Sequence, residues 1–136
     1  DGRMTNVDLA EKVGISAPPC LRRVRALEKA GYLTGYHADV DSAKLGFTVT
    51  VFAMVGLHSQ ADKDLQAFEE LVRSWPEVRE CHMLNGDIDF ILKCVSEDLS
   101  SFQMFLTQKL TPAPNVANVK TSLTIRQTKK QPGVPL

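Results

Sequence analysis

Two stretches of the chain hold side chains whose types and spacing could do chemistry, and the first runs from Glu80 to Asp89. It contains a cysteine beside a histidine and two aspartates two residues apart. Neighbours in a strand point to opposite faces, so His82 is poorly placed to activate Cys81 as a nucleophile. Asp87 and Asp89 can share one side, as a carboxylate pair for a metal ion or for acid–base catalysis would require. No complementary histidine, lysine or further acidic cluster converges on them in the sequence, which argues against both kinds of site.

Recognition of a small zwitterion fits this stretch better than catalysis does. A carboxylate can bind an ammonium group, and Gly86 allows backbone N–H groups to approach the carboxylate of a ligand. The alternative is a simple capped hairpin turn at Asn85-Gly86-Asp87, which the spacing alone favours.

The second stretch is a basic helix near the N-terminus. Apolar residues between positions 5 and 31 recur at helical spacing, which predicts two helices joined by a tight turn. Thr5-Asn6-Val7-Asp8 is a capping box that starts the first helix, and Gly14 favours its end. Ser16 is the expected N-cap of the second helix, which reaches about Ala30. The inner face of that helix is expected to hold Leu21, Val24 and Leu27.

A basic second helix fits a helix-turn-helix, in which this helix enters the major groove of DNA. The side chains that we expect at DNA are Ser16, Pro18, Arg22, Arg23, Arg25 and Lys29. An ordinary helical hairpin with a solvated cationic face fits the spacing equally well. Two free-standing helices lack a core, and DNA-binding units of this type normally pack a third, so we expect the first helix to be missing from this chain.

Beyond Gly46 the pattern changes from helical to alternating, which marks a second structural unit. Strands are expected at residues 48–57, 78–84, 89–95 and 116–125, and amphipathic helices at 62–75 and 99–110. This order is that of a split β-α-β pair. Right-handed crossovers place both helices on one face of a four-stranded antiparallel sheet, so the other face stays bare. Dimerisation through the bare face is the economical way to cover it.

Composition limits the classes of function. The chain has 16 Lys and Arg against 16 Asp and Glu, but the basic residues predominate at both ends and the acidic residues in the middle. A local basic face is enough for DNA binding. The three cysteines form no C-x-x-C pair, and no apolar run or signal-peptide pattern indicates a membrane segment or export. We therefore expect a cytoplasmic protein without catalytic residues, metal or cofactor.

The chain resembles the Lrp/AsnC family, also called feast/famine regulatory proteins, which are bacterial and archaeal transcription factors that respond to amino acids. The resemblance rests on residues 1–9 (DGRMTNVDL), 13–16 (VGIS), 19–28 (PCLRRVRALE) and 31–36 (GYLTGY). It continues through Glu80-Cys81-His82 and Gly86-Asp87-Ile88-Asp89 to Leu92-Lys93. These stretches span nearly the whole chain in the expected order.

The resemblance implies an α+β fold in four parts. A partial winged helix-turn-helix occupies residues 1–31, a linker with a strand occupies 32–45, a ferredoxin-like βαββαβ effector and oligomerisation domain occupies 46–126, and a tail occupies 127–136. Sheet-to-sheet homodimers that assemble into tetramers, octamers or larger rings are implied as well.

The resemblance also implies a binding site, because family members bind amino acids between neighbouring dimers, around the turn that matches Asn85-Gly86-Asp87. The implied pocket residues are Met83, Leu84, Asn85, Gly86, Asp87 and Asp89, with Thr111 from the facing dimer. The implied effector is leucine or another L-amino acid, and the implied partner is double-stranded promoter DNA. The rival hypothesis is an amino-acid-binding oligomerisation module that does not bind DNA.

Overall fold

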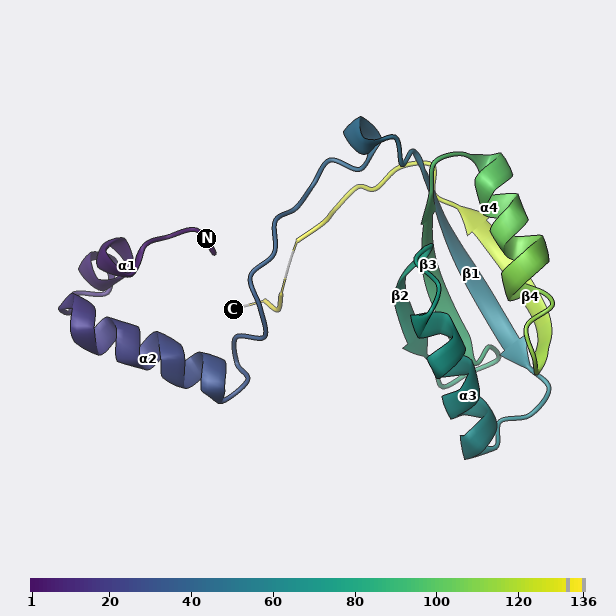
Figure 1. Cartoon of the computed structure of the whole chain (residues 1–136), viewed down its shortest axis with the longest axis horizontal. Coiled ribbons are helices and arrows are strands. Elements are labelled where there is room, and N and C mark those ends of the chain that lie inside the picture. Colours follow the sequence, from purple (N-terminus) through teal and green to yellow (C-terminus); the bar gives the residue numbers. More distant parts are fainter. Residues whose placement is uncertain (132, 136) are drawn as a thin grey trace. The chain divides into compact units, whose positions relative to one another are not determined.

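The computed structural model describes residues 1–131 and 133–135, so the predicted tail at 127–136 lies outside the described residues at positions 132 and 136. The chain forms two compact units, Asp1–Val40 and Asp41–Leu136, whose elements are labelled in Figure 1. The first unit holds two helices, and the second combines helices with a sheet. This arrangement confirms the predicted α+β class.

The first unit contains α1 (Asn6–Lys12) and α2 (Ala17–Lys29). The Thr5 hydroxyl accepts the Asp8 backbone N–H at 3.1 Å, as the predicted capping box requires. Gly14 and Gly31 follow the two helices with φ of 70° and 76°. Glycine adopts this left-handed backbone at little cost, so the chain can leave each helix at these points.

The linker at residues 32–45 lacks the strand that the resemblance implies, and its regular element is the 3-10 helix η1 (Ala43–Leu45). A strand needs a neighbouring strand for its backbone hydrogen bonds, and in the described part of this single chain no strand pairs with the linker. Tyr36 instead donates its hydroxyl to the Glu28 carboxylate at 2.9 Å, and this hydrogen bond raises the pKa of Tyr36. The expected linker strand is therefore not formed in the single chain.

The second unit contains a four-stranded antiparallel sheet in the order β2-β3-β1-β4. Its elements are, in chain order, β1 (Val49–Leu57), α3 (Asp62–Arg73), β2 (Val78–Met83), β3 (Phe90–Ser96), α4 (Leu99–Phe105), the π-helix η2 (Leu106–Leu110) and β4 (Val116–Leu123). The strand and helix order confirms the predicted βαββαβ arrangement.

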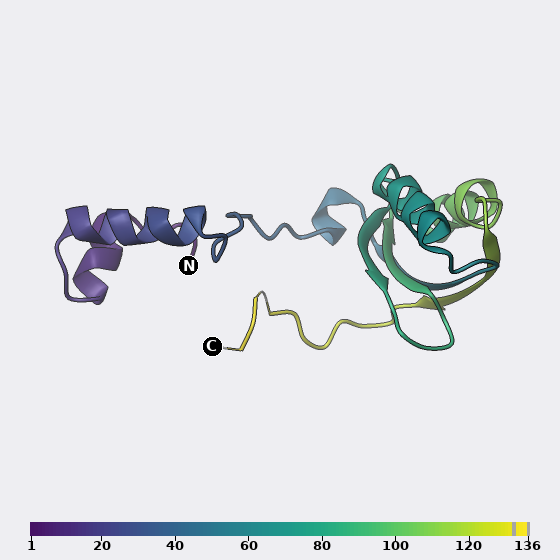
Figure 2. The ribbon, with the colours of Figure 1, turned by 90° about the horizontal axis from the view of Figure 1, so that it is seen from below.

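The core lies between the sheet and the helices α3 and α4, which cover the same face of the sheet (Figure 2). Alternate residues of β1 point into the core, and Val51, Ala53, Val55 and Leu57 are all buried, as the alternation predicts. Phe68 of α3 packs on Phe90 of β3 with ring centroids 4.9 Å apart. Burial of this apolar surface fixes the sheet under the helices.

The opposite face of the sheet is uncovered within the described chain. Phe52 in β1 is 37% exposed on this face, and Met54 is half-buried. Across β2 and β3, Lys93 donates from Nζ to Glu80 Oε1 at 2.6 Å. The face therefore combines apolar side chains with an ion pair, and the expected bare face is present in the single chain.

Candidate functional site

Three loops lie at the end of the sheet where β1 ends and β3 and β4 begin (Figure 1). They are the turn at residues 84–89, the loop at residues 58–61 after β1, and the loop at residues 111–115 before β4. The turn is tied to β1, because the Asp89 N–H donates to Val55 O at 3.0 Å. The Leu84 N–H donates to Asp89 O at 2.8 Å and closes the turn. The turn that carries most of the predicted effector residues is therefore held to the end of the sheet by backbone hydrogen bonds.

Asp89 and Asp87 differ in environment, although their spacing in the sequence allows both to lie on one side. Asp89 is half-buried, and its Oδ2 accepts the Leu57 N–H at 2.6 Å, with Gln60 Nε2 at 3.4 Å from the same oxygen. Asp87 is exposed in the turn. For the described residues, the hydrogen bonds to Asp89 reach Oδ2, so Oδ1 can accept from a ligand. The Asp89 carboxylate therefore supports the sheet end and still has an oxygen available for recognition.

The turn presents the other predicted residues to solvent. Asn85, Gly86 and Asp87 are exposed, and Met83 and Leu84 beside them are 59% and 41% exposed. A Cβ added to Gly86 would meet no atom within 4 Å, so the chain itself leaves open space there. Residues 83–89 therefore form one strip around the turn, in which a backbone hydrogen bond places apolar Leu84 beside Asp89.

Thr111 is the one predicted effector residue on a different loop. It follows η2, and its backbone N–H donates to Leu106 O at 2.8 Å. It is exposed and belongs to the loop that leads into β4, whereas the turn joins β2 to β3 on the other side of the sheet. The assignment of Thr111 to a site shared with a facing dimer stays a prediction.

Sequence analysis missed the loop at residues 58–61 and its contact with Asn115. Asn115 Oδ1 accepts the Ser59 N–H at 2.9 Å, and Asn115 Nδ2 donates to Ser59 O at 2.8 Å. These two residues lie 56 positions apart, so no local pattern connects them. The only available signal is the residue type, because asparagine tolerates positive φ and Asn115 has a φ of 68°.

The cysteines of the sheet have the character of core thiols. Burial raises the pKa of the Cys81 thiol and raises that of Cys94 to about 12. His82 is exposed, and its Nε2 lies 3.6 Å from Glu80 Oε2. The imidazole therefore faces a carboxylate.

Helix α2 holds the residues predicted to contact DNA. Ser16, Pro18, Arg22, Arg23, Arg25 and Lys29 are all exposed. Ser16 is the N-cap residue, but its side chain makes no capping hydrogen bond, so the hydroxyl can contact a phosphate instead. Asn6 Nδ2 donates to Ala17 O at 2.9 Å and so joins the first turns of α1 and α2. Together these features leave the start of α2 fixed and its cationic side accessible.

The predicted inner face of α2 is only partly correct. Cys20 is buried and Val24 is half-buried, but Leu21 and Leu27 are 37% and 43% exposed. The short helix α1 covers only a narrow strip of α2. Side chains at the two edges of the apolar face of α2 therefore cannot both pack against α1. Leu21 and Leu27 therefore remain accessible in the single chain.

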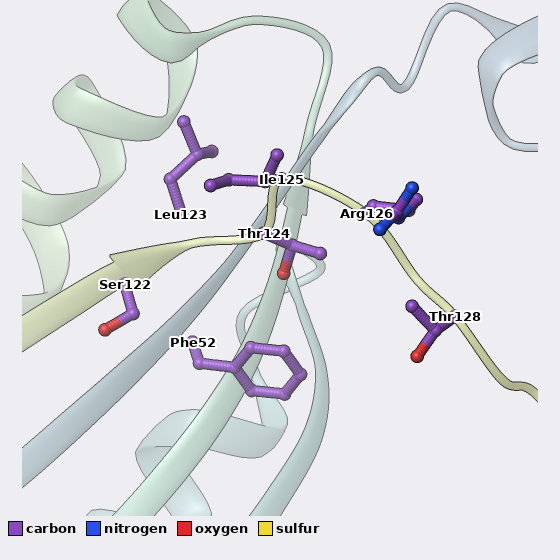
Figure 3. A pocket seen from close by; sticks show the side chains of 7 residues that line it. All are labelled: Phe52, Ser122, Leu123, Thr124, Ile125, Arg126 and Thr128. Atoms are coloured by element: carbon purple, nitrogen blue, oxygen red, sulfur yellow. The ribbon is translucent and has the colours of Figure 1, made fainter.

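A groove of about 660 Å³ lies on the uncovered face of the sheet, near the end of β4 (Figure 3). Its lining residues are Phe52, Ser122, Leu123, Thr124, Ile125, Arg126 and Thr128. Because Val51 pairs with Leu123 and Leu57 with Val116, this groove and the 84–89 turn lie at opposite ends of β1. The groove is therefore a separate feature from the predicted effector site.

In residues 1–131 and 133–135, no group of three or more His, Cys, Asp or Glu side chains is arranged to hold a metal ion. None of the helices described there is both long enough and apolar enough to cross a membrane.

Family models match both units of the chain. The model for the Lrp/AsnC ligand binding domain matches residues 50–134, and that for a winged helix-turn-helix DNA-binding domain matches residues 1–34. The leucine-responsive regulatory protein of Rhizobium meliloti is 56% identical over 129 residues, which are 95% of this chain and 83% of the relative. The Bkd operon transcriptional regulator of Pseudomonas aeruginosa is 40% identical over 136 residues, covering 100% of this chain and 89% of the relative.

Solved structures match across almost the whole chain. A transcriptional regulator from Neisseria meningitidis, solved as an L-Met complex, is 32% identical and has a TM-score of 0.92 over 98% of this chain and 86% of its own. An AsnC family transcriptional regulator from Agrobacterium tumefaciens is 30% identical and has a TM-score of 0.91 over 99% of this chain and 88% of its own.

Proposed function

Because the chain belongs to the Lrp/AsnC family of transcriptional regulators, we propose that an amino acid bound at the 84–89 turn controls how this regulator engages promoter DNA. The observation that carries the proposal is the exposed strip at the end of the sheet. It holds two carboxylates, apolar side chains and open space at Gly86, all within the part of the chain that matches a ligand binding domain.

The chemistry of the strip suits a free amino acid. Asp89 Oδ1 and the Asp87 carboxylate can accept from an ammonium group, while backbone N–H groups near Gly86 can approach a carboxylate. Met83 and Leu84 offer apolar surface to an aliphatic side chain. An apolar effector such as leucine or methionine is supported by the names of the relatives, which include a leucine-responsive regulator and an L-Met complex.

DNA recognition is assigned to α2. Its exposed arginines and lysine can contact phosphates and guanine edges, and the backbone N–H groups at its start can hold a phosphate. Paired recognition helices of a dimer would meet two half-sites, so we expect a roughly palindromic operator. The regulator would then act in the cytoplasm with the DNA, without enzymatic activity or a cofactor.

Assembly is assigned to the uncovered face of the sheet. Phe52 is 37% exposed there and Met54 is half-buried, and a second copy of the sheet would remove both side chains from water. Such a homodimer leaves the 84–89 turn at its end, where a neighbouring dimer can add Thr111. Ligand binding and assembly into tetramers or octamers would then favour each other reciprocally.

A thermal-shift panel of the twenty standard L-amino acids on the full chain tests the effector site. A ligand at about 100 times its Kd stabilises by about 2.7 kcal/mol, or roughly 5–10 °C for a domain of this size. We expect a shift with one or a few apolar amino acids and none in Asp87→Ala, which should keep the oligomeric state of the wild type. An unchanged shift in Asp87→Ala would refute the site assignment.

DNA binding separates this proposal from an amino-acid-binding module without DNA binding. Affinity for a palindromic duplex should fall as salt rises, and Arg22→Ala should reduce the slope of log K against log salt by about 1 if Arg22 contacts a phosphate. Fluorescence anisotropy at several salt concentrations measures both quantities. Absence of salt-dependent binding by the full chain would favour the rival module.

A further inference from the structure

The loop at residues 58–61 lies against the 84–89 turn and is held by hydrogen bonds on both sides. We propose that this loop is a second wall of the effector site, with Gln60 as a residue that binds the carboxylate of the ligand and Asn115 as the residue that positions the loop. The inference rests on the proposed function, since it concerns the same amino acid ligand.

Gln60 joins the loop to the turn. Its Nε2 donates to Leu57 O at 3.0 Å and lies 3.4 Å from Asp89 Oδ2. The second distance is at the long limit for a hydrogen bond, and that oxygen already accepts the Leu57 N–H at 2.6 Å. The second N–H of the Gln60 amide is therefore weakly engaged, although the side chain is exposed at the edge of the site. A ligand carboxylate offers it a stronger, charge-assisted acceptor.

Asn115 fixes this loop from the other side. Besides its two side-chain hydrogen bonds to the backbone of Ser59, its carbonyl oxygen accepts the His58 N–H at 2.9 Å. Ser59 in turn donates from Oγ to Asp64 Oδ2 at 2.6 Å, at the start of α3. The short loop is thus attached to the residue that precedes β4 and to the first turn of α3.

The hydrogen bonds that hold the loop at residues 58–61 indicate a role for it in ligand recognition. Connecting loops on a surface are usually mobile, and a mobile loop loses conformational entropy when it orders around a ligand. Here the entropy is lost on folding, so Gln60 is held beside Asp89 before a ligand arrives. The pair then presents an amide donor and a carboxylate acceptor side by side, which match the carboxylate and ammonium groups of one free amino acid.

Isothermal titration calorimetry on the full chain tests the role of Gln60, with each of the twenty standard L-amino acids as probe. We expect Gln60→Ala to weaken binding about ten-fold or more, the loss typical of a hydrogen bond to a charged group. Gln60→Glu should weaken it further, because it places a second carboxylate beside the carboxylate of the ligand. The matched control is Gln66→Ala, which removes an exposed glutamine whose Nε2 donates to Asp62 within α3. It should bind as the wild type does.

Asn115→Gly tests the positioning role. Glycine keeps the positive φ of residue 115 but removes both side-chain hydrogen bonds to Ser59. We expect weaker amino acid binding here too, while the Tm of Gln60→Ala without ligand stays within a few degrees of the wild type, as for an exposed substitution.

The outcomes distinguish amino acid binding by the protein from the individual roles of Gln60 and Asn115. If the wild type binds none of the twenty amino acids, the proposed function fails and the inference fails with it. If the wild type binds and Gln60→Ala binds equally tightly, only the inference about Gln60 is overturned. If Gln60→Ala is impaired but Asn115→Gly matches Gln66→Ala, the positioning role of Asn115 is overturned.

Discussion

The two units of the chain are stabilised by different kinds of interaction. In the first unit, Ala10 and Cys20 are the buried apolar residues among those described, and the helices start and stop at local signals such as Thr5 and Gly14. In the second unit, side chains from all parts of the sheet and both helices form one continuous core. We therefore expect substitutions in the first unit to change stability slightly and locally, whereas substitutions in the core of the second unit should destabilise the whole domain.

The largest effect is expected in the core of the second unit. Leu92 in β3 is fully buried, so Leu92→Ala should lower the free energy of unfolding by about 2–5 kcal/mol through lost burial and a residual cavity. Urea denaturation followed by circular dichroism measures it. Leu27→Ala in α2 is the matched leucine of the first unit and should cost much less, because that side chain is 43% exposed. Equal losses would break the contrast between the units.

The next effect is expected at the end of the sheet. Asp89→Ala leaves the Leu57 N–H without its carboxylate acceptor, which should cost about 1–3 kcal/mol of stability. Asp87→Ala removes an exposed carboxylate and should change stability by no more than about 0.5 kcal/mol. Chemical denaturation of both variants measures the difference. A loss of stability in Asp87→Ala as large as that in Asp89→Ala would contradict the distinct roles of the two aspartates.

A smaller effect is expected within the first unit. Thr5→Ala removes the cap of α1 and should destabilise that helix by about 1 kcal/mol. Ser16→Ala should cost less, because the Ser16 side chain makes no capping hydrogen bond to α2. Hydrogen exchange of the α1 and α2 amides measures both, and the core amides of the second unit should be unaffected. Altered exchange in β3 would show that the units are energetically linked.

The smallest effect is expected at the ion pair on the uncovered face. The hydrogen bond from Lys93 holds the pKa of Glu80 below its ordinary value. Because the folded state favours the charged form, the pair stabilises at pH values above the ordinary Glu pKa, and this stabilisation disappears as the pH falls through the lowered pKa. Lys93→Met should therefore reduce stability at neutral pH by less than about 1 kcal/mol.

Denaturation of both proteins between pH 7 and pH 3 checks this prediction, since the difference between wild type and Lys93→Met should shrink as Glu80 becomes protonated. A difference that is constant across this range would mean that Lys93 stabilises the sheet by packing alone.

The sequence by itself determined the elements and their order. The capping box at Thr5, the glycines that end the helices, and the alternation in residues 49–57 each act over a few neighbouring positions. Helical and strand periods can be read without knowing what the elements pack against. The turn at residues 84–89 was predicted for the same reason.

Only the tertiary structure decided what the site residues do. Asp89 supports the end of β1 because Leu57 is brought to it from 32 positions away, and Asn115 fixes Ser59 across 56 positions. The exposure of Leu21 and Leu27 and the missing linker strand likewise depend on which partners the single chain offers. Local patterns specify how the backbone of each segment folds. Contacts between distant segments form only when the strands pair into the sheet, and their geometry cannot be predicted from patterns of neighbouring residues.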